Sequence, residues 1–341
     1  MEHTTQKIKT LFLVAGKSGG HIIPCLTVAA AAKKDDPLTR TILLSTNTLL
    51  DKQLIESSSP IDHHYTLPFG TGITYTIRSL IILAYHGAYS CIMSFYYLWR
   101  HQPTSLISTG GLVCLPVCLV AFLLRIPITL YELNAVPGKA LKTVSPLATI
   151  IYVCFPVAQS FFNTQKTHSI SYPLRFDPCT ITPAVWDTAN RTVILITGGS
   201  QGSVGINTIM KQWIIDHPPL HAAIAIVHQT GALDDFDWHS FYAQYAIPAH
   251  VFDYCETIER WYARADVIVC RAGAGTLFEL YALRKPAIIM PLVTTATDHQ
   301  VTNAYAMYQE HADLFQVIQE KATHTDPLIM HHALQKYIKL K

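Results

Sequence analysis

Short hydrophobic runs, many of them rich in β-branched residues, alternate along the chain with stretches long enough to form helices. In the N-terminal half the runs are TLFLVA (10–15), TILLS (41–45), SLIS (105–108), PITLY (127–131) and TIIYV (149–153). In the C-terminal half they are TVILIT (192–197), AAIAIV (222–227), DVIVC (266–270) and PAIIM (286–290). Such alternation is typical of parallel sheets with helices on both faces. The pattern predicts an α/β fold with doubly wound parallel sheets.

The alternation is interrupted by a proline-rich and polar segment from Asp177 to Asn190. We therefore predict an N-terminal domain of residues 1–176, a linker of residues 177–190 and a C-terminal domain of residues 191–341. A chain of 341 residues is long enough for two domains of ordinary size. A return of the C-terminal helix to the N-terminal domain is left open.

Each predicted domain begins with a hydrophobic strand that runs into a glycine loop and then a helix. The loops are AGKSGGH (15–21) and GGSQGSVG (198–205). Glycines at such a turn leave backbone N–H groups exposed at a helix N-terminus, where a diphosphate is stabilised. Because ligands bind outside the carboxyl ends of parallel strands, two such loops predict one cleft between the domains. Taken alone, each loop could equally be a structural turn, since neither matches a standard nucleotide-binding motif.

Three further positions carry side chains suited to a sugar-nucleotide site. His21 follows the first loop at a helix start, where the helix field favours the neutral ring that a general base needs. Glu279 lies one turn into the helix after CRAGAG and could accept the hydroxyl groups of a ribose, or be a solvated acid. The segment DHQVTNA (298–304) offers amides for sugar hydroxyls, or an ordinary helix cap at Asp298.

Two stretches without Asp, Glu, Lys or Arg are long enough to be considered as membrane spans. Residues 101–124 contain two prolines and two glycines, and predict a strand, a glycine loop and a buried helix instead. Residues 79–99 are rich in tyrosine and end in a tryptophan, residues that favour a membrane interface. For this stretch a buried helix, a helix on a membrane surface and a true span all remain open.

Composition excludes several classes of protein. With 50% hydrophobic residues and a net charge of +2, the chain is neither disordered nor charged like a nucleic-acid-binding protein. Basic residues outnumber acidic ones in residues 1–150, so this half could face an anionic surface. The eight cysteines form no CxxC pair, which argues against zinc and redox motifs. The short apolar run near the N-terminus is no signal peptide, and we expect a cytoplasmic protein.

Six segments in this order resemble the MurG family of bacterial glycosyltransferases, which transfer N-acetylglucosamine (GlcNAc) from UDP-GlcNAc to lipid I to make lipid II for peptidoglycan. The segments are AGKSGGHIIPCLTVA, STGGLVCLPVCLVAFLLRIPITLYELNAVPGKA, YPLRFD, ITGGSQGSVGIN, ADVIVCRAGAGTLFEL and DHQVTNA. The resemblance implies the GT-B fold, with two Rossmann-like domains facing across a cleft. It also implies a membrane-associating acceptor domain and a C-terminal UDP-sugar domain.

The resemblance assigns roles to individual residues of this chain. It makes His21 the base, Asn134 a sugar contact, Arg175 and Ser200 the partners of the diphosphate, Cys255 a neighbour of uracil, and Glu279 the ribose acceptor. It places GlcNAc against Gln300 and, less clearly, His299. The full predicted UDP-GlcNAc-binding set is Ser18, Gly19, Gly20, Asn134, Arg175, Ser200, Cys255, Ala274, Gly275, Thr276, Leu277, Phe278, Glu279 and Gln300. Lys17 and the triplet Tyr131–Leu133 depart from the usual family residues.

These assignments predict an inverting displacement in which the 4-hydroxyl of MurNAc in lipid I attacks the anomeric carbon of GlcNAc. No metal and no cofactor are expected. The expected partners are UDP-GlcNAc, lipid I, an anionic membrane surface and other cell-wall synthesis proteins, but no nucleic acid. The expected location is peripheral, on the cytoplasmic face of the inner membrane. A UDP-GlcNAc 2-epimerase and a non-catalytic nucleotide-sugar-binding subunit are the alternatives.

Overall fold

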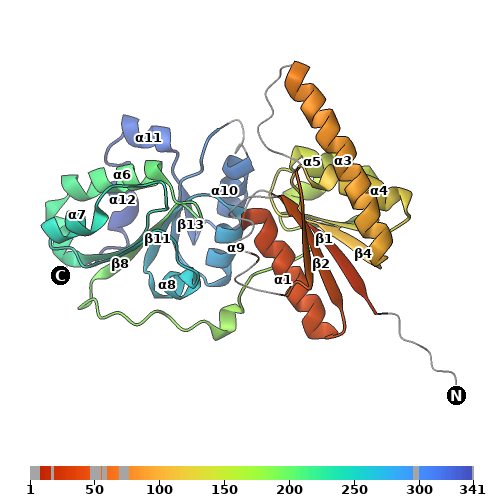
Figure 1. Ribbon diagram of the computed structural model, residues 1–341. Helices are drawn as coiled ribbons and strands as arrows, with labels where there is room; N and C mark the ends of the chain where they lie inside the picture. The colour runs from red at the N-terminus through yellow and green to blue at the C-terminus, as the bar shows by residue number, and fades with distance from the viewer. Residues whose placement is uncertain are drawn as a thin grey trace. The chain divides into compact units, whose positions relative to one another are not determined.

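The chain folds into two compact units, Met1–Arg175 and Phe176–Lys341 (Figure 1). The computed structural model describes residues 8–16, 19–46, 55, 60–68, 77–294 and 299–339, with the backbone alone for 77–81 and 83. Each unit contains one sheet in which every strand pair is parallel, flanked by helices. The prediction of two parallel-sheet α/β domains is therefore confirmed.

The sheet of the first unit has seven strands in the order β3-β2-β1-β4-β5-β6-β7. Their bounds are β1 Thr10–Val14, β2 Arg40–Thr46, β3 His63–Leu67, β4 Ser105–Ser108, β5 Ile128–Glu132, β6 Ile150–Val153 and β7 Thr167–Ser169. Successive side chains of β1 enter two different cores, with Phe12 and Val14 in one and Leu11 and Leu13 in the other. Because both faces are buried, the central strands are mostly hydrophobic and do not alternate with polar residues.

Helices cover both faces of this sheet, as Figure 1 shows. The core on one face contains Ile22 and Cys25 of α1, while the core on the other contains Leu98 of α3, Val117 of α4 and Leu141 of α5. The helix bounds in this unit are α1 Gly19–Asp35, α3 Ile77–His101, α4 Cys114–Leu123 and α5 Lys139–Val144, with 3-10 turns η1 Ser145–Leu147 and η2 Pro156–Phe161. Residues 101–124 form β4, the loop with Gly110 and Gly111, and α4, as predicted.

The sheet of the second unit has six strands in the order β10-β9-β8-β11-β12-β13. Their bounds are β8 Thr192–Thr197, β9 Ile224–Gln229, β10 Ala249–Phe252, β11 Val267–Cys270, β12 Ala287–Ile289 and β13 Phe315–Val317. The helices are α6 Val204–Asp216, α7 Trp238–Gln244, α8 Ile258–Arg264, α9 Ala274–Ala282, α10 His299–Glu310, α11 Glu320–Thr325 and α12 Ile329–Gln335, with η3 Pro178–Thr180 and η4 Pro218–Ala223. Met330 and Leu334 of α12 lie in the core of this unit with Trp213.

The segment predicted as a linker lies against α8 of the second unit. The guanidinium of Arg260 donates to the carbonyl of Thr182 at 3.3 Å, and that of Arg264 donates to the hydroxyl of Thr188 at 2.8 Å. The ring of Trp186 lies edge-on to His250, with 4.6 Å between ring centroids. These contacts make the segment part of the second unit rather than a free tether.

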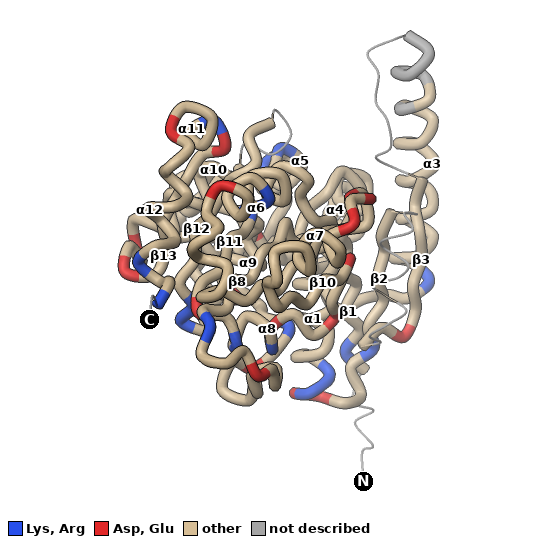
Figure 2. The backbone as a smooth tube through the Cα atoms, turned by 90° about the vertical axis from the view of Figure 1, so that its left-hand side faces the viewer, with Lys and Arg blue, Asp and Glu red and all other residues tan. Residues whose placement is uncertain are grey.

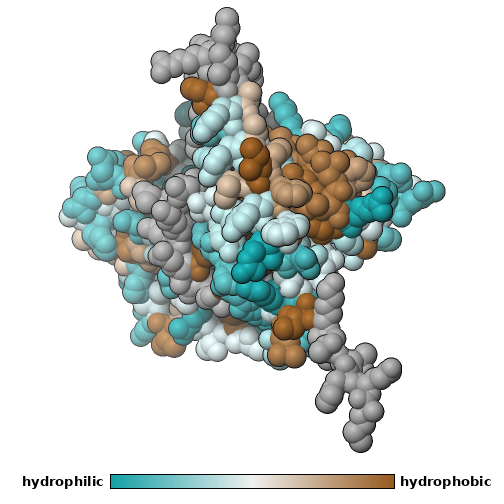
Figure 3. Space-filling view, turned by 45° about the vertical axis from the view of Figure 1, so that its right-hand side comes forward, coloured by the Kyte–Doolittle hydropathy of each residue, from teal (hydrophilic) through white to brown (hydrophobic). Residues whose placement is uncertain are grey.

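The long helix α3 exposes large apolar and aromatic side chains on one side, and its buried side contains small serines as well as a leucine. Ser90, Ser94 and Leu98 are buried, while Ile92 and Trp99 are 67% and 61% exposed. Among the described side chains of α3, the large exposed ones are Ile82, Tyr85, Tyr89, Ile92, Phe95, Tyr96 and Trp99. Along the part of α3 that Figure 2 colours, no charged residue occurs before the C-terminal end, and Figure 3 shows a hydrophobic area beside the helix. Among the described residues, no helix has the length and hydropathy required to cross a bilayer.

Candidate active site

Loops from two neighbouring strands of the first sheet meet at its carboxyl edge. Gly16 follows β1, and Gly110 and Gly111 follow β4, with φ angles of +109° and +86° that favour glycine. A Cβ on Gly111 would lie 3.1 Å from the backbone of Gly16, so the two loops are in close contact. Gly19 begins α1 and is buried, and Gly20 is exposed. The predicted Ser18 and the unusual Lys17 lie outside the described residues.

His21, the predicted base, is half-buried in the first turn of α1, with its ring held by the β4 loop. Its Nδ1 lies 2.7 Å from the carbonyl oxygen of Thr109, and the Thr109 hydroxyl donates to the His21 carbonyl at 2.8 Å. A carbonyl only accepts, so Nδ1 carries the hydrogen and the neutral ring has its lone pair on Nε2. The Cβ that Gly110 lacks would lie 3.3 Å from Cε1 of this ring. Thr109 and Gly110 therefore set the tautomer and the orientation of His21.

The buried carboxyl group of Glu132 holds the loop that contains Asn134 in place through hydrogen bonds. Glu132, the last residue of β5, is 2% exposed and accepts from the backbone N–H of Asn134 at 2.9 Å and that of Gly138 at 3.2 Å. It also accepts from the Asn134 side-chain amide at 3.3 Å. Burial raises the pKa of Glu132 to about 7, although these hydrogen bonds act in the opposite direction. Glu132 was not among the predicted site residues; an acid that ends a buried strand was the signal for it.

The second glycine loop follows β8 at the carboxyl edge of the second sheet. Gly199 and Gly202 have φ angles of +81° and +72°, and a Cβ on Gly198 would lie 2.1 Å from the carbonyl carbon of Gly202. Only glycines allow a turn this tight. The Ser203 hydroxyl caps α6 by accepting from the backbone N–H of Ile206, and Ser200 at the loop tip is exposed. The loop therefore presents a hydroxyl and a helix N-terminus to solvent, which suits an anion.

Arg271, which sequence reasoning did not select, holds three segments of the second unit together. Its guanidinium donates to the Ser203 hydroxyl at 2.9 Å, to the Met290 carbonyl at 3.0 Å and to a carboxylate oxygen of Glu320 at 2.6 Å. The residue is only 6% exposed. A buried guanidinium needs several acceptors, and here all three come from different loops or helices.

The remaining predicted residues of the second unit also follow the carboxyl ends of its strands. Cys255 follows β10, and Ala274–Glu279 lie in α9 after β11. Glu279 is 9% exposed. Gln300 is the second residue of α10 and accepts from the backbone N–H of Leu292 at 3.1 Å, which ties the helix to the loop after β12. Asp298 lies outside the described residues.

The structure thus brings the predicted residues together in two groups, one at each carboxyl edge. Gly19, Gly20, His21 and Asn134 are on the first unit, and Ser200, Cys255, Ala274–Glu279 and Gln300 are on the second. His299 begins α10 beside Gln300. Arg175 is half-buried at the end of the first unit. The cleft between the groups stays a prediction. The described residues contain no cluster of three or more His, Cys, Asp or Glu side chains able to hold a metal ion.

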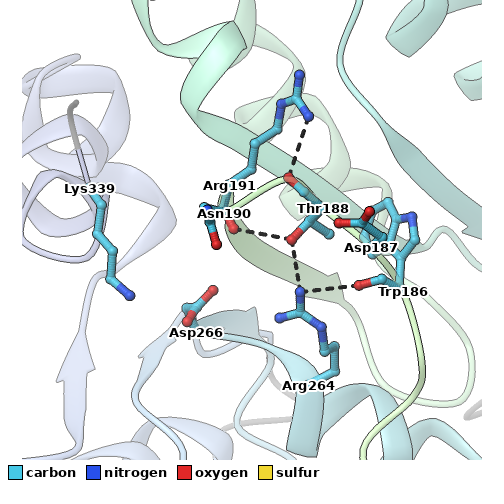
Figure 4. A pocket seen from close by; sticks show the side chains of 8 residues that line it. All are labelled: Trp186, Asp187, Thr188, Asn190, Arg191, Arg264, Asp266 and Lys339. Carbon is cyan, nitrogen blue, oxygen red and sulfur yellow. Dashed lines mark hydrogen bonds between the residues drawn. The ribbon is translucent and has the colours of Figure 1, made fainter.

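A pocket in the second unit lies at the opposite edge of the sheet (Figure 4). The lining residues are Trp186, Asp187, Thr188, Asn190, Arg191, Arg264, Asp266 and Lys339. Arg191 directly precedes β8 and Asp266 directly precedes β11, so the pocket is at the amino ends of these strands. Asp266 accepts from the backbone N–H of Val193 at 2.8 Å. Arg264 joins Trp186 and Thr188 to α8 at this edge, away from the glycine loop.

Comparison with known proteins matches both units. The glycosyltransferase family 28 N-terminal domain matches residues 11–153, and its C-terminal domain matches residues 193–336. A UDP-N-acetylglucosamine–N-acetylmuramyl-(pentapeptide) pyrophosphoryl-undecaprenol N-acetylglucosamine transferase of Syntrophotalea carbinolica is 30% identical over 310 residues, covering 89% of this chain and 84% of the relative. The chain belongs to the MurG family. The Myxococcus xanthus member is 28% identical over 89% of this chain and 79% of its own length.

Solved structures show the same fold. Acinetobacter baumannii MurG aligns with a TM-score of 0.72 at 23% identity, over 97% of this chain and 91% of that chain. A UDP-N-acetylglucosamine 2-epimerase aligns with a TM-score of 0.59 at 12% identity, over 94% of this chain and 88% of that chain. The GT-B architecture is therefore shared by MurG proteins and epimerases, and sequence similarity rather than fold separates them.

Gly110→Ala should destabilise the first unit, because it places a Cβ 3.0 Å from Leu141 and 3.3 Å from the His21 ring at a φ of +109°. We expect a loss of about 1–3 kcal/mol in the free energy of unfolding. Gly138→Ala is the matched control, since a Cβ there has no neighbour within 4 Å and φ is −60°. It should be neutral or slightly stabilising in thermal unfolding. Equal destabilisation by both variants would contradict the close packing at Gly110.

Glu132→Gln should change how stability depends on pH. The folded carboxyl has a pKa of about 7, against an ordinary value of 4.5 for a glutamate in the unfolded chain, so between these values the folded protein binds more protons than the unfolded chain. The contribution is therefore fully present below about pH 4.5 and is lost as pH rises through 7. Relative to the Gln variant, the wild type should lose up to about 3 kcal/mol of stability between pH 5 and pH 8. Urea unfolding at both pH values tests this, with the exposed Asp235→Asn as control. A pH-independent difference would rule the effect out.

Proposed function

We propose that this protein transfers GlcNAc from UDP-GlcNAc to the 4-hydroxyl of MurNAc in lipid I, with inversion at the anomeric carbon, and so makes lipid II. The observation that carries the proposal is membership of the MurG family along both units, with relatives named as N-acetylglucosamine transferases. The geometry at the two carboxyl edges supports it. One edge offers an oriented histidine, and the other offers an exposed glycine loop at a helix N-terminus.

In this reaction the acceptor oxygen forms a bond to the anomeric carbon while the bond from that carbon to UDP breaks. His21 takes the proton of the acceptor hydroxyl on Nε2, the nitrogen that its Nδ1 contact with Thr109 leaves as the base. The N-terminus of α1 disfavours a positive charge on the resting ring and so keeps it neutral before the reaction. The donated N–H at Nδ1 then stabilises the imidazolium that forms.

Departure of UDP requires stabilisation of negative charge on the diphosphate. We assign this role to the loop 198–203, with Ser200 and the N-terminus of α6, and to Arg175. We assign the ribose hydroxyls to Glu279, the uracil side to Cys255 and the GlcNAc hydroxyls to Gln300 and Asn134. Arg271 supports the diphosphate loop from behind through Ser203 and is a positioning residue.

The first unit is proposed to rest on the cytoplasmic face of the inner membrane through α3 and α4. Burial of Ser90 and Ser94 turns the aromatic side of α3 outward, and α4 adds exposed Leu119, Phe122 and Leu123. The exposed basic residues near this surface are Arg100, Arg125, Lys139 and Lys142. An apolar surface flanked by cations suits an anionic membrane interface, where tyrosine and tryptophan are favoured. Lipid I, the proposed acceptor, lies in such a membrane.

Release of UDP from UDP-GlcNAc tests the function. We expect release only when lipid I is present. Conversion of UDP-GlcNAc into its 2-epimer with no net release of UDP would favour an epimerase, and UDP-GlcNAc binding with neither reaction would favour a non-catalytic subunit. His21→Ala should lower kcat by about 100-fold or more, since general base catalysis contributes that much, with little change in UDP affinity. Glu279→Ala should weaken UDP binding instead. A kcat within a few-fold of wild type in His21→Ala would refute the base assignment.

Flotation with vesicles tests the membrane surface. Binding to vesicles that contain phosphatidylglycerol should weaken as salt rises, because screening reduces the electrostatic part of the interaction. Replacing Tyr85, Ile92 and Trp99 together by Ser should abolish binding at every salt concentration. Replacing Val185 and Leu328, exposed apolar residues of the second unit, by Ser is the control and should leave binding unchanged. Unaltered binding of the α3 variant would place the contact elsewhere.

A further inference from the structure

A buried amide connects the two loops that lie on either side of β9. Gln229, the last residue of β9, is 3% exposed. Its Nε2 donates to the carbonyl of Gly199 at 2.7 Å, and its Oε1 accepts from the backbone N–H of Cys255 at 3.2 Å. Gly199 belongs to the glycine loop after β8, and Cys255 belongs to the loop after β10. One side chain therefore uses its donor on one loop and its acceptor on the other.

The two residues after Gln229 contact the same pair of loops. A Cβ on Gly202 would lie 2.2 Å from the Thr230 carbonyl, and a Cβ on Gly231 would lie 2.4 Å from the Gln201 carbonyl. On the other side, the backbone N–H of Thr230 donates to the carbonyl of Phe252 at 3.0 Å. Residues 229–231 thus lie between the glycine loop and the loop after β10, and contact both.

We propose that Gln229 is a positioning residue for the nucleotide, whose amide sets the spacing between the loop 198–203 and the loop 253–257. This rests on the proposed function, in which the first loop binds the diphosphate and the second faces the base. Gln229 is buried beneath both loops and contacts the backbone of each, so it acts through them rather than on UDP. Only a side chain with a donor and an acceptor at this distance satisfies both backbone groups. When the spacing between the two loops is fixed, the uridine and the diphosphate of one UDP molecule bind to both loops at once. Binding of either part then raises the effective concentration of the other part at its own loop.

The test compares whole UDP with its two halves. Dissociation constants of UDP, uridine and inorganic pyrophosphate are measured by calorimetry for the wild type and for Gln229→Met, which keeps the size but loses the bonds to both loops and a 3.4 Å contact with the Thr197 hydroxyl. We expect UDP affinity to fall at least about tenfold, because the two ends of UDP no longer bind as linked groups at a set spacing. Uridine and pyrophosphate affinities should each stay within about threefold, because each loop keeps its own groups and loses only its spacing.

Gln316→Met is the matched control, because Gln316 is on the edge strand β13 of the same sheet and its buried Oε1 has no hydrogen-bond partner among the described residues. It should leave all three affinities unchanged. If Gln229→Met does not fold, judged by its melting temperature, Gln229→Glu at pH 8 is measured with the same expected pattern. Equal weakening of all three ligands, or unchanged UDP affinity, would overturn the positioning role alone. Failure of the wild type to bind UDP would overturn the proposed donor, and this inference with it.

Discussion

Close approach of backbone to backbone at the carboxyl edges is the constraint on which both groups of predicted site residues depend. In the first unit β1 and β4 are neighbours, so the loops that follow them must share the same space. They do so because Gly16 and Gly111 have no side chains to separate them. In the second unit the loops after β8 and β9 meet in the same way at Gly202 and Gly231. Substituted glycines would push the loops apart and displace the helix N-termini that follow them.

This constraint is visible in the sequence because it is local. Glycine loops directly after hydrophobic strands predicted the two strand-to-helix turns that suit anion binding, and also the position of His21 at a helix start. The central strands were equally visible, because burial on both faces makes most of their positions apolar. The strands that were missed are β3, β7, β10 and β13, which are the edge strands of the two sheets. Their sequences, HHYTL, THS, AHVF and FQV, are short or polar because one side has no neighbouring strand.

The supporting contacts of the site could not be predicted, because their partners are distant along the chain. Thr109 is 88 residues from the histidine that it orients, and Glu320 is 49 residues from the arginine that it pairs with. The same holds for Gln229, whose partners follow two other strands of the sheet. Sequence patterns report which residues have suitable chemistry, whereas the topology decides which of them meet. Glu132 is an intermediate case, since its partners are local but the burial that raises its pKa is a property of the whole sheet.

Helix α3 shows why the amount of hydrophobic surface matters less than its direction. The stretch 79–99 was compatible with a buried helix, a surface helix and a span, because hydropathy averages over all sides of a helix. The structure separates the sides: small Ser90 and Ser94 allow close packing on the first unit, and the large aromatic residues remain outside. Exposing seven large apolar or aromatic side chains on one helix costs free energy in water, and the cost is offset when a membrane interface takes the place of water. The serines are therefore as important to the proposed membrane contact as the aromatic residues, because exchanging the two sides would bury the aromatic surface and leave nothing to dock.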